Sequence, residues 1–284
     1  MRRGANPWLE PAALLILLPV LLGAAGAPER AVAPDPAAER ELVERINDVR
    51  ARNGLPRLEL SPRLAEAARA QALEMARQRS VSHRFPQEEG LRQRVAVTSL
   101  RFDFVGENVG RNRDAEKAHR EFLSSPGHRE NILDPRANAV GIGAVRTEED
   151  GDNLWVAEDF AHVVPDYEPL QVEQVVAAHI AELRQQAGQP PLQRAELGPV
   201  RQEACAMSLT DQVSASHQAA PHLRGTLHTI AYSSADPERI PEQLRDEVQR
   251  ERPGSFSVGA CFSRTPGYPA GAYWVVVVFY FPVK

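Results

Sequence analysis

The stretch that decides the fold is Ser124–Leu133, which reads SSPGHRENIL. Its Pro–Gly pair marks a turn, and His128 follows at once. An imidazole held directly after a tight turn can move a proton, bind a metal ion or simply satisfy the backbone of the turn. The stretch alone leaves these three roles open, so the rest of the chain has to decide between them.

The 284-residue chain has an ordinary globular composition, with 43% hydrophobic and 25% charged residues and a net charge of −5. Its length accommodates two domains of usual size. A nucleic-acid-binding protein calls for a basic patch or for aromatic residues interleaved with basic ones. The sequence has neither pattern, which argues against nucleic acid as a partner.

The N-terminus is typical of a secretory signal peptide. Arg2 and Arg3 precede the apolar run LLILLPVLL (14–22), and the small residues GAAGA follow. The run is shorter than the roughly 20 residues that span a bilayer. We therefore assign residues 1–27 to the signal, with cleavage between 25 and 33. The mature protein is expected to be secreted, periplasmic or in the cell envelope, with no stable membrane span.

Capping residues and periodic apolar residues predict the elements that follow. Asp35 and Ser61 each precede a proline at the first helical position, which marks two helix starts. Apolar periodicity predicts helices at 36–53, 62–79 and 114–123 and a β-hairpin of 139–145 with 154–160. His83 falls in the loop after the second of these helices.

A Pro-rich linker over 163–171 separates two halves that resemble each other. Corresponding positions lie 134 residues apart early in the halves and 119 apart at their ends, as for Gly54 and Gly188, His83 and His217, and Trp155 and Trp274. Helix, glycine, histidine and final strand recur in one order, which indicates an internal duplication. We expect two tandem copies, at 36–162 and 172–284, the second about 15 residues shorter.

These motifs together resemble the CAP superfamily of cysteine-rich secretory, antigen 5 and pathogenesis-related proteins, and most of all its exported bacterial members. The motifs, in order, are SH at 82–83, GEN at 106–108, SPGHRENIL at 125–133 and VGIG at 140–143, before a Trp-containing strand. The resemblance covers about 36–165 and is weak over 170–284, as in a degenerate second copy. It implies an α+β fold, a three-layer α-β-α sandwich, whose groove holds two histidines and two glutamates and, in some members, zinc.

Carried over position by position, the resemblance places four residues in that groove. His83 and His128 match the two histidines and Glu107 matches the first glutamate, while Ser125 stands where the second glutamate is expected. Glu158, in the strand WVAEDF, is an additional candidate carboxylate. Two imidazoles and a carboxylate suit zinc. The resemblance thus makes His83, His128 and Glu107 candidate Zn²⁺ ligands, in a site weakened by the lack of a carboxylate at Ser125.

The resemblance also bears on the second copy. Aligning LHTIA with GENVG places His228 at the position of Glu107, and no PGH segment follows, so we expect a scaffold without a site. In the family fold helices cover the sheet, which brings Cys205 near Cys261 and predicts one disulfide in an exported protein. Outside the motifs, His119 is expected on a solvated helix surface, and His162 begins the linker with no expected role.

Three functions stay open. The one we favour is an exported binding module whose His/Glu groove holds an unknown extracellular ligand, which is a lipid, a peptide or a glycan. The alternatives are a metal-dependent hydrolase of peptide or cell-wall bonds and a purely structural or interaction protein. No GxSxG sequence marks a serine nucleophile. The sequence decides neither whether the protein is an enzyme nor what its oligomeric state is.

Overall fold

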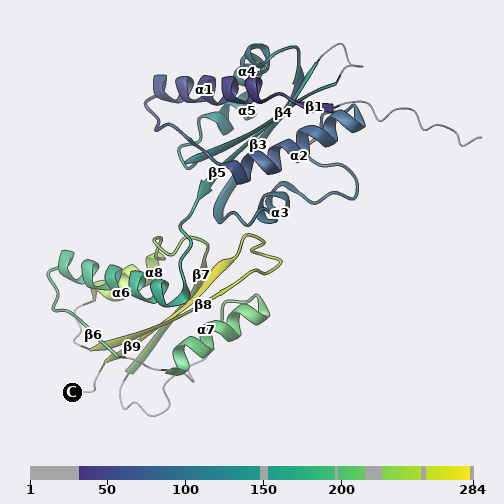
Figure 1. The fold of residues 1–284 in the computed structure, drawn as a ribbon. Coiled ribbons are helices and arrows are strands. Elements are labelled where there is room, and N and C mark those ends of the chain that lie inside the picture. Colours follow the sequence, from purple (N-terminus) through teal and green to yellow (C-terminus); the bar gives the residue numbers. More distant parts are fainter. Residues whose placement is uncertain (1–31, 148–152, 196–197, 215–225, 251–253, 282–284) are drawn as a thin grey trace, which may run out of the picture.

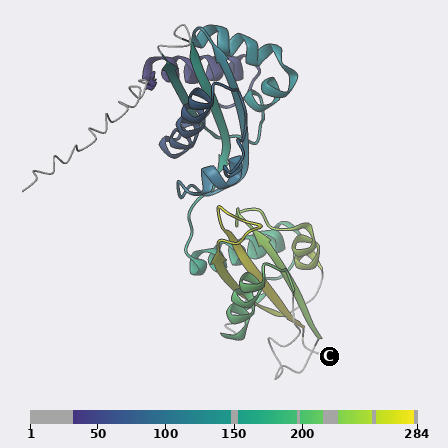
Figure 2. The same cartoon turned by 90° about the vertical axis from the view of Figure 1, so that its right-hand side faces the viewer.

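A computed structural model describes residues 32–147, 153–195, 198–214, 226–250 and 254–281. The expected signal peptide (1–27) and His217 lie outside these ranges. Two units follow one another along the chain, each a twisted sheet with helices on both faces (Figures 1 and 2). Within the described ranges, no helix combines the length and apolarity needed to cross a membrane.

The first unit, residues 32–163, contains the expected helices and hairpin. Its elements are β1 (Val32–Pro34), α1 (Pro36–Arg52), β2 (Glu59–Leu60), α2 (Pro62–Gln78), α3 (Leu91–Ala96), β3 (Phe102–Asn112), α4 (Ala115–Ser124), α5 (Pro126–Ile132), β4 (Ala139–Thr147) and β5 (Leu154–Val163). The strand order is β1-β4-β5-β3, and the short β2 pairs with β4 in parallel. β4 and β5 form the predicted antiparallel hairpin, and β3 lies at the edge beside β5.

The helices start where capping side chains satisfy free backbone N–H groups. Asp35 accepts a hydrogen bond from the backbone of Ala38, and Ser61 accepts one from that of Leu64. α2 lies very close to β4, because a Cβ added to Gly143 would come within 2.3 Å of the α2 backbone. Only glycine allows that approach.

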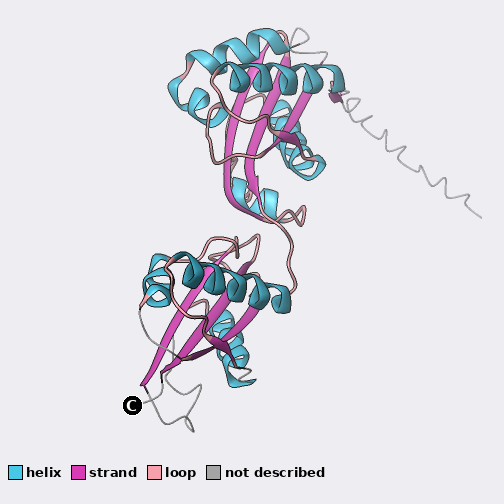
Figure 3. Ribbon diagram, turned by 90° about the vertical axis from the view of Figure 1, so that its left-hand side faces the viewer, coloured by secondary structure: helices cyan, strands magenta, loops and turns pink. Residues whose placement is uncertain are grey.

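Helices cover both faces of the first sheet, as Figure 3 shows. α1, α4 and α5 cover one face, where Leu42 packs in a cluster with Phe160. α2 and α3 cover the other face, where Met75 packs in a cluster with Trp155. The result is the predicted α-β-α sandwich, with a core on each side of the sheet.

The second unit, residues 169–281, is built on a separate sheet. Its elements are α6 (Pro169–Gln186), β6 (Gln193–Arg194), α7 (Gly198–Thr210), β7 (Thr226–Ser234), α8 (Glu242–Gln249), β8 (Ser255–Ser263) and β9 (Ala272–Phe281). The strand order is β6-β8-β9-β7. α6 and α8 pack on one face and α7 on the other. A disulfide joins Cys205 of α7 to Cys261 of β8, with a Cα–Cα distance of 5.0 Å.

The linker is shorter than the predicted 163–171, because β5 runs to Val163 and α6 already begins at Pro169. Glu168 and Gln171 form a capping box that fixes the start of α6. The buried apolar residues of α6 begin at Val172, whereas Leu170 in its first turn is exposed. The capping residues therefore set the start of α6, although the Pro-rich composition of this stretch predicts a linker.

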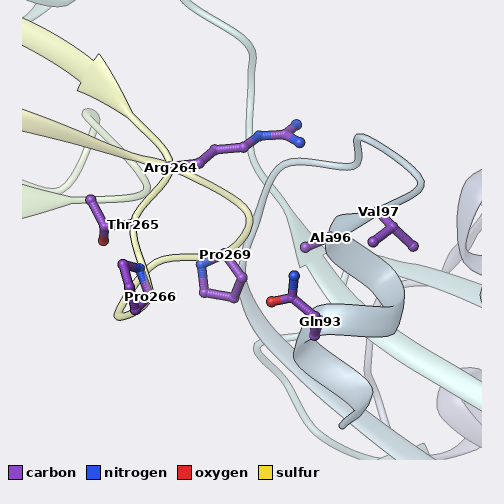
Figure 4. Close-up of a pocket in the computed structure, with 7 residues that line it drawn as sticks. All are labelled: Gln93, Ala96, Val97, Arg264, Thr265, Pro266 and Pro269. Carbon is purple, nitrogen blue, oxygen red and sulfur yellow. The ribbon is translucent and has the colours of Figure 1, made fainter. Parts of the chain in front are cut away.

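The two units touch at the end of the first sheet. The guanidinium of Arg101 lies 3.9 Å from the ring centre of Phe262 and 4.9 Å from that of Tyr273, which are both in the second unit. Ala270 packs in the α2–α3 core of the first unit. Figure 4 shows α3 facing the β8–β9 loop around a cavity of about 350 Å³ lined by Gln93, Ala96, Val97, Arg264, Thr265, Pro266 and Pro269.

Candidate functional site

The GEN motif lies on β3, where successive side chains point to opposite faces of the sheet. Glu107 points to the side of α3 and bonds Arg94 there. Asn108 points to the side of α5 and bonds the backbone of His128. One short piece of edge strand therefore presents functional groups to both layers of helices.

Glu107 is buried, and its two oxygens bind two basic side chains. Nδ1 of His83 donates to Oε2 at 2.8 Å, and Nη2 of Arg94 donates to Oε1. The side chain of Glu107 is 2% exposed, whereas that of His83 is 60% exposed. The hydrogen bond with Glu107 is the main cause that raises the pKa of His83. A buried carboxylate thus holds an accessible imidazole and favours its charged form.

A second carboxyl group lies beside Glu107 on the neighbouring strand. Asp159 of β5 pairs in register with Glu107 and is fully buried. Burial raises the pKa of Asp159 well above its usual range, and the charge of Glu107 raises it further. The neutral form of Asp159 is therefore favoured, which leaves the charge of Glu107 to be balanced by Arg94.

His128 is held on the other face by two asparagines. Nδ2 of Asn108 donates to the backbone oxygen of His128 at 3.1 Å. Nδ2 of Asn131 donates to Oδ1 of Asn108 at 2.9 Å and to the backbone oxygen of Glu107 at 3.0 Å. The ring of His128 meets that of Phe122 edge to face, with centroids 5.0 Å apart. These contacts tie α5 to β3 and orient the ring.

The two imidazoles have opposite tendencies. Burial lowers the pKa of His128, and the charge of His83 lowers it further. The pKa of His83 is instead raised. Over an interval of pH, His83 is therefore a charged donor while His128 is neutral. Such a pair can bind a group that accepts from one ring and donates to the other, or it can transfer a proton.

The remaining candidates have supporting positions. Ser125 is the N-cap residue of α5, and its side chain makes no capping hydrogen bond. Glu158 is fully buried on the α4–α5 side, where it accepts a hydrogen bond from Nδ2 of Asn108 at 2.9 Å. Burial raises the pKa of Glu158 to about 8. Glu158 therefore supports Asn108 from within the core and does not face a ligand.

Three residues of this site were missed from the sequence, namely Arg94, Asn131 and Asp159. Asn131 lies within SPGHRENIL and Asp159 within WVAEDF, but neither motif by itself indicates a role for them. Arg94 lies in α3, a six-residue helix without a motif. Its role depends on α3 packing beside β3, which no local pattern encodes. A charged side chain on a short helix that turns out to be mostly buried is a signal only once the fold is known.

The expectation for His119 was wrong. This residue of α4 is buried rather than solvated. Burial is the main cause that lowers the pKa of His119 to about 4, and the charges of Arg45 and Arg52 on α1 lower it further. The helix turns this ring toward α1, so it is a neutral core residue.

The placement of His162 at the start of the linker was also wrong. His162 lies in β5, and its Nδ1 is 2.7 Å from Oδ1 of Asp103. Within the described part of the chain, one group of three His, Asp or Glu side chains has ligand atoms all within 4.8 Å of one another. It consists of Asp103, His162 and Asp236 and includes neither His83 nor His128.

Comparison with known proteins identifies the first unit. Residues 43–158 match the model of the CAP family, described as the cysteine-rich secretory protein family. An uncharacterized Bacillus subtilis protein, YkwD, is 28% identical over 123 residues, which are 43% of this chain and 46% of YkwD. The chain spans less than half the length of the curated relatives that it matches. Residues 43–158 therefore form a CAP domain with bacterial homologues.

Solved structures give similar matches. An extracellular protein containing an SCP domain from Bacillus anthracis is 23% identical, with a TM-score of 0.41, over 45% of this chain and 41% of that one. An outer surface protein from Borrelia burgdorferi is 19% identical, with a TM-score of 0.44, over 47% of this chain and 98% of that one.

Proposed function

We propose that residues 36–162 act as an exported binding module, in which His83 and His128 hold a polar group of an extracellular ligand. The observation that carries this proposal is the buried Glu107, which holds the accessible ring of His83 by one nitrogen. A buried charge at a sheet edge destabilises a fold unless it is paired. Its presence beside an exposed imidazole supports a functional role over a structural one.

The ligand we favour is a peptide or a glycan that carries a carboxylate. A cavity of about 670 Å³ lies along α5, the helix that carries His128, and is lined by Pro126, Arg129, Glu130, Leu133, Asp134, Pro135 and Arg136. Four of these side chains are charged, which suits a polar ligand better than an acyl chain. The two arginines offer planar donors for a carboxylate.

The test is a binding screen of the mature protein against peptide and glycan fragments of cell walls. His83→Ala should weaken any specific binding at least about tenfold, a loss of about 1.4 kcal/mol. His228→Ala is the matched control, because His228 is also a half-exposed histidine paired with a buried glutamate, Glu247. Equal weakening by both variants, or by neither, would contradict the proposal.

The second candidate is a metal-dependent hydrolase, favoured by the opposite pKa shifts of His83 and His128. Zinc fits this donor set in one way. Both oxygens of Glu107 are engaged, so Glu107 would orient His83, as a carboxylate behind a ligating histidine does, while His83 and His128 bind the ion. Bound zinc would supply an acidified water. Ser125 offers no carboxylate in support.

Calorimetric titration with zinc tests that second candidate. Binding by the wild type that is lost in His128→Ala, together with turnover on a fluorogenic peptide or glycan panel that is lost in His83→Ala, would favour the hydrolase. Binding should also weaken as pH falls, because a protonated imidazole cannot ligate. Turnover that survives both substitutions would contradict this assignment.

We also infer that the second unit is a diverged copy of the first. Arg50 of α1 and Arg184 of α6 are both buried and make matching hydrogen bonds. Arg50 donates to the carbonyl oxygens of Pro56, in the loop after α1, and Ile132, at the end of α5. Arg184 donates to those of Pro190, in the loop after α6, and Val248 of α8. Two further pairs correspond, Glu39 with Arg69 and Glu173 with Arg201, and in each the glutamate also accepts from a backbone N–H of the central hairpin. Three unrelated interactions in one spatial order support duplication.

On this inference the expected place of His228 changes. His228 pairs with Phe279 of β9 as Gly106 pairs with Phe160 of β5, so it takes the position of Gly106 rather than that of Glu107. Thr229 then stands where Glu107 does. The second copy therefore has no carboxylate at the position of Glu107, and we infer that it acts as a scaffold. An experimental structure of the second unit without the α6–sheet–α7 layers would contradict the duplication.

A further inference from the structure

Three metal-binding side chains meet where the two units touch. Asp103 lies on β3 and His162 on β5, both in the first unit, whereas Asp236 follows β7 in the second. One ligand atom of each lies within 4.8 Å of the other two. These residues are far apart in sequence and come from two sheets, so their meeting depends on how the units pack.

Each of the three side chains is held in place by its own contacts. Nδ1 of His162 is 2.7 Å from Oδ1 of Asp103. Asp236 is buried, and its Oδ1 accepts from the backbone N–H of Glu238 at 3.0 Å. Ser234 fixes the backbone of Asp236 through two hydrogen bonds of its hydroxyl. A donor set that is already positioned loses little entropy when it binds an ion.

The charges at this place are not balanced. Arg239 bridges the two carboxylates, with Nη1 3.2 Å from Oδ2 of Asp103 and Nε 3.5 Å from Oδ2 of Asp236. Its side chain is 60% exposed. Arg136 is a further cation near Asp103. Its hydrogen bond with Asp134 is the main cause that raises its pKa, and the charge of Asp103 raises it to a smaller extent. One bridging guanidinium therefore faces two carboxylates, whereas a divalent ion would supply both positive charges.

We propose that Asp103, His162 and Asp236 bind a divalent transition-metal cation of the zinc type, which ties the two units together. One imidazole and two carboxylates suit zinc, whose bonds to such ligands are about 2.0 to 2.2 Å long. The ligands of a tetrahedral ion lie roughly 3.4 Å apart. His162 and Asp103, now 2.7 Å apart, would separate slightly, and Asp236, within 4.8 Å of both, would move inward. Arg239 is the competitor that the ion displaces toward solvent.

Calorimetric titration with zinc chloride tests the site in the metal-stripped mature protein. The background carries His83→Ala and His128→Ala, so that the candidate site of the CAP domain contributes nothing. One ion should bind per chain. His162→Ala and Asp236→Asn should each weaken binding at least about tenfold. Asp166→Asn is the matched control, because Asp166 is an exposed carboxylate that pairs with Arg101 at the same contact, and it should bind zinc like the background.

Arg239→Gln gives a change of opposite sign. Removing the competitor should tighten zinc binding and enlarge the rise of the melting temperature that zinc causes. Circular dichroism establishes that each variant is folded, and His162→Gln replaces His162→Ala if the alanine variant is not. No saturable binding up to about millimolar zinc (weaker than about −4 kcal/mol), unchanged binding in the His162 variant, or weaker binding in Arg239→Gln would each overturn the proposal.

Discussion

β5 and β9, the central strands of the two units, carry different kinds of side chain at positions that the proposed duplication aligns. β5 of the first unit carries Glu158 and Asp159, both fully buried. β9 of the second unit carries Val277 and Val278, which are buried to the same extent. Glu158 pairs with Ile142 and Asn108 on its neighbouring strands, and Val277 pairs with Val258 and Ile230.

The valines are what a sheet covered by helices on both faces favours, because burial of apolar surface stabilises the fold. Two buried carboxyl groups at the same depth destabilise it. They support Glu107 and Asn108, the residues that hold His83 and α5. On the proposed duplication, the comparison teaches that the first unit gives up core stability to hold His83 and α5, whereas the second unit has valines at the aligned positions.

The largest expected effect tests whether the two units share one scaffold. Arg50→Met removes four hydrogen bonds to backbone carbonyl groups that are buried or partly buried, and Arg184→Met removes three such bonds in the second unit. Each substitution should lower the free energy of unfolding of its own unit by about 5 kcal/mol, since the acceptors stay buried without partners. Urea denaturation followed by fluorescence in Trp274→Phe and Trp155→Phe backgrounds, which each keep one of the two buried tryptophans, reports the units separately. A large loss of stability in Arg50→Met but not in Arg184→Met would contradict the proposed correspondence between the two units.

The disulfide should give the next largest effect, confined to the second unit. Cys205 and Cys261 are 56 residues apart. The chain-entropy estimate for a loop of that length is about 4 kcal/mol. The double substitution Cys205→Ser/Cys261→Ser should shift the transition reported by Trp274 and leave that of Trp155 in place. Two free thiols in non-reducing mass spectrometry of exported protein would show that the bond does not form.

The buried acid of the first unit should make that unit alone sensitive to pH. The pKa of Glu158 is about 8 in the folded state, against an ordinary value of 4.5. Ionisation therefore favours unfolding, and stability falls as pH rises from about 4.5 to about 8. Glu158→Gln cannot ionise and still accepts from Asn108, so it should stabilise the first unit by about 3 kcal/mol at pH 7.

Urea denaturation between pH 5 and pH 8 checks this prediction. The stabilisation by Glu158→Gln should shrink toward the acidic end, because the unfolded carboxyl becomes more protonated as pH approaches its ordinary pKa of 4.5. The second unit, with Val277 at the corresponding place, provides the internal control. A variant that is less stable than the wild type at pH 8 would mean that Glu158 is ionised in the native protein.

Much of the scaffold could be predicted because its signals are local. Asp35 and Ser61 cap helices followed by proline, and the hairpin strands alternate around a polar turn. These features depend on neighbours a few residues away, which a sequence displays directly. The start of α6 was misplaced because capping by Glu168 outweighed a Pro-rich composition.

The site could be predicted only in part, because its energetics are long-range. His83, Glu107 and His128 came from motif order, yet Arg94 and Asp159 act through packing across the sheet. The facing of Glu158 likewise followed from which helix layer covers each side of β5. Burial and charge pairing change with the whole fold, so residues such as these show their roles only in three dimensions.

The smallest expected effect concerns the histidines themselves. Glu107→Gln removes the carboxylate whose hydrogen bond is the main cause of the raised pKa of His83, so that pKa should fall. The pKa of His128 should rise in response, because the charge of His83 is one cause that lowers it. A histidine with a raised pKa stabilises the folded state below its unfolded pKa and loses that contribution as pH rises through its folded pKa. Glu107→Gln should therefore remove the small histidine contribution at acidic pH, which adds to the pH-independent loss of the buried pair with Arg94. Titration of the ring C–H signals by NMR measures both shifts, and Glu247→Gln, which alters the pair of the second unit, should move neither signal.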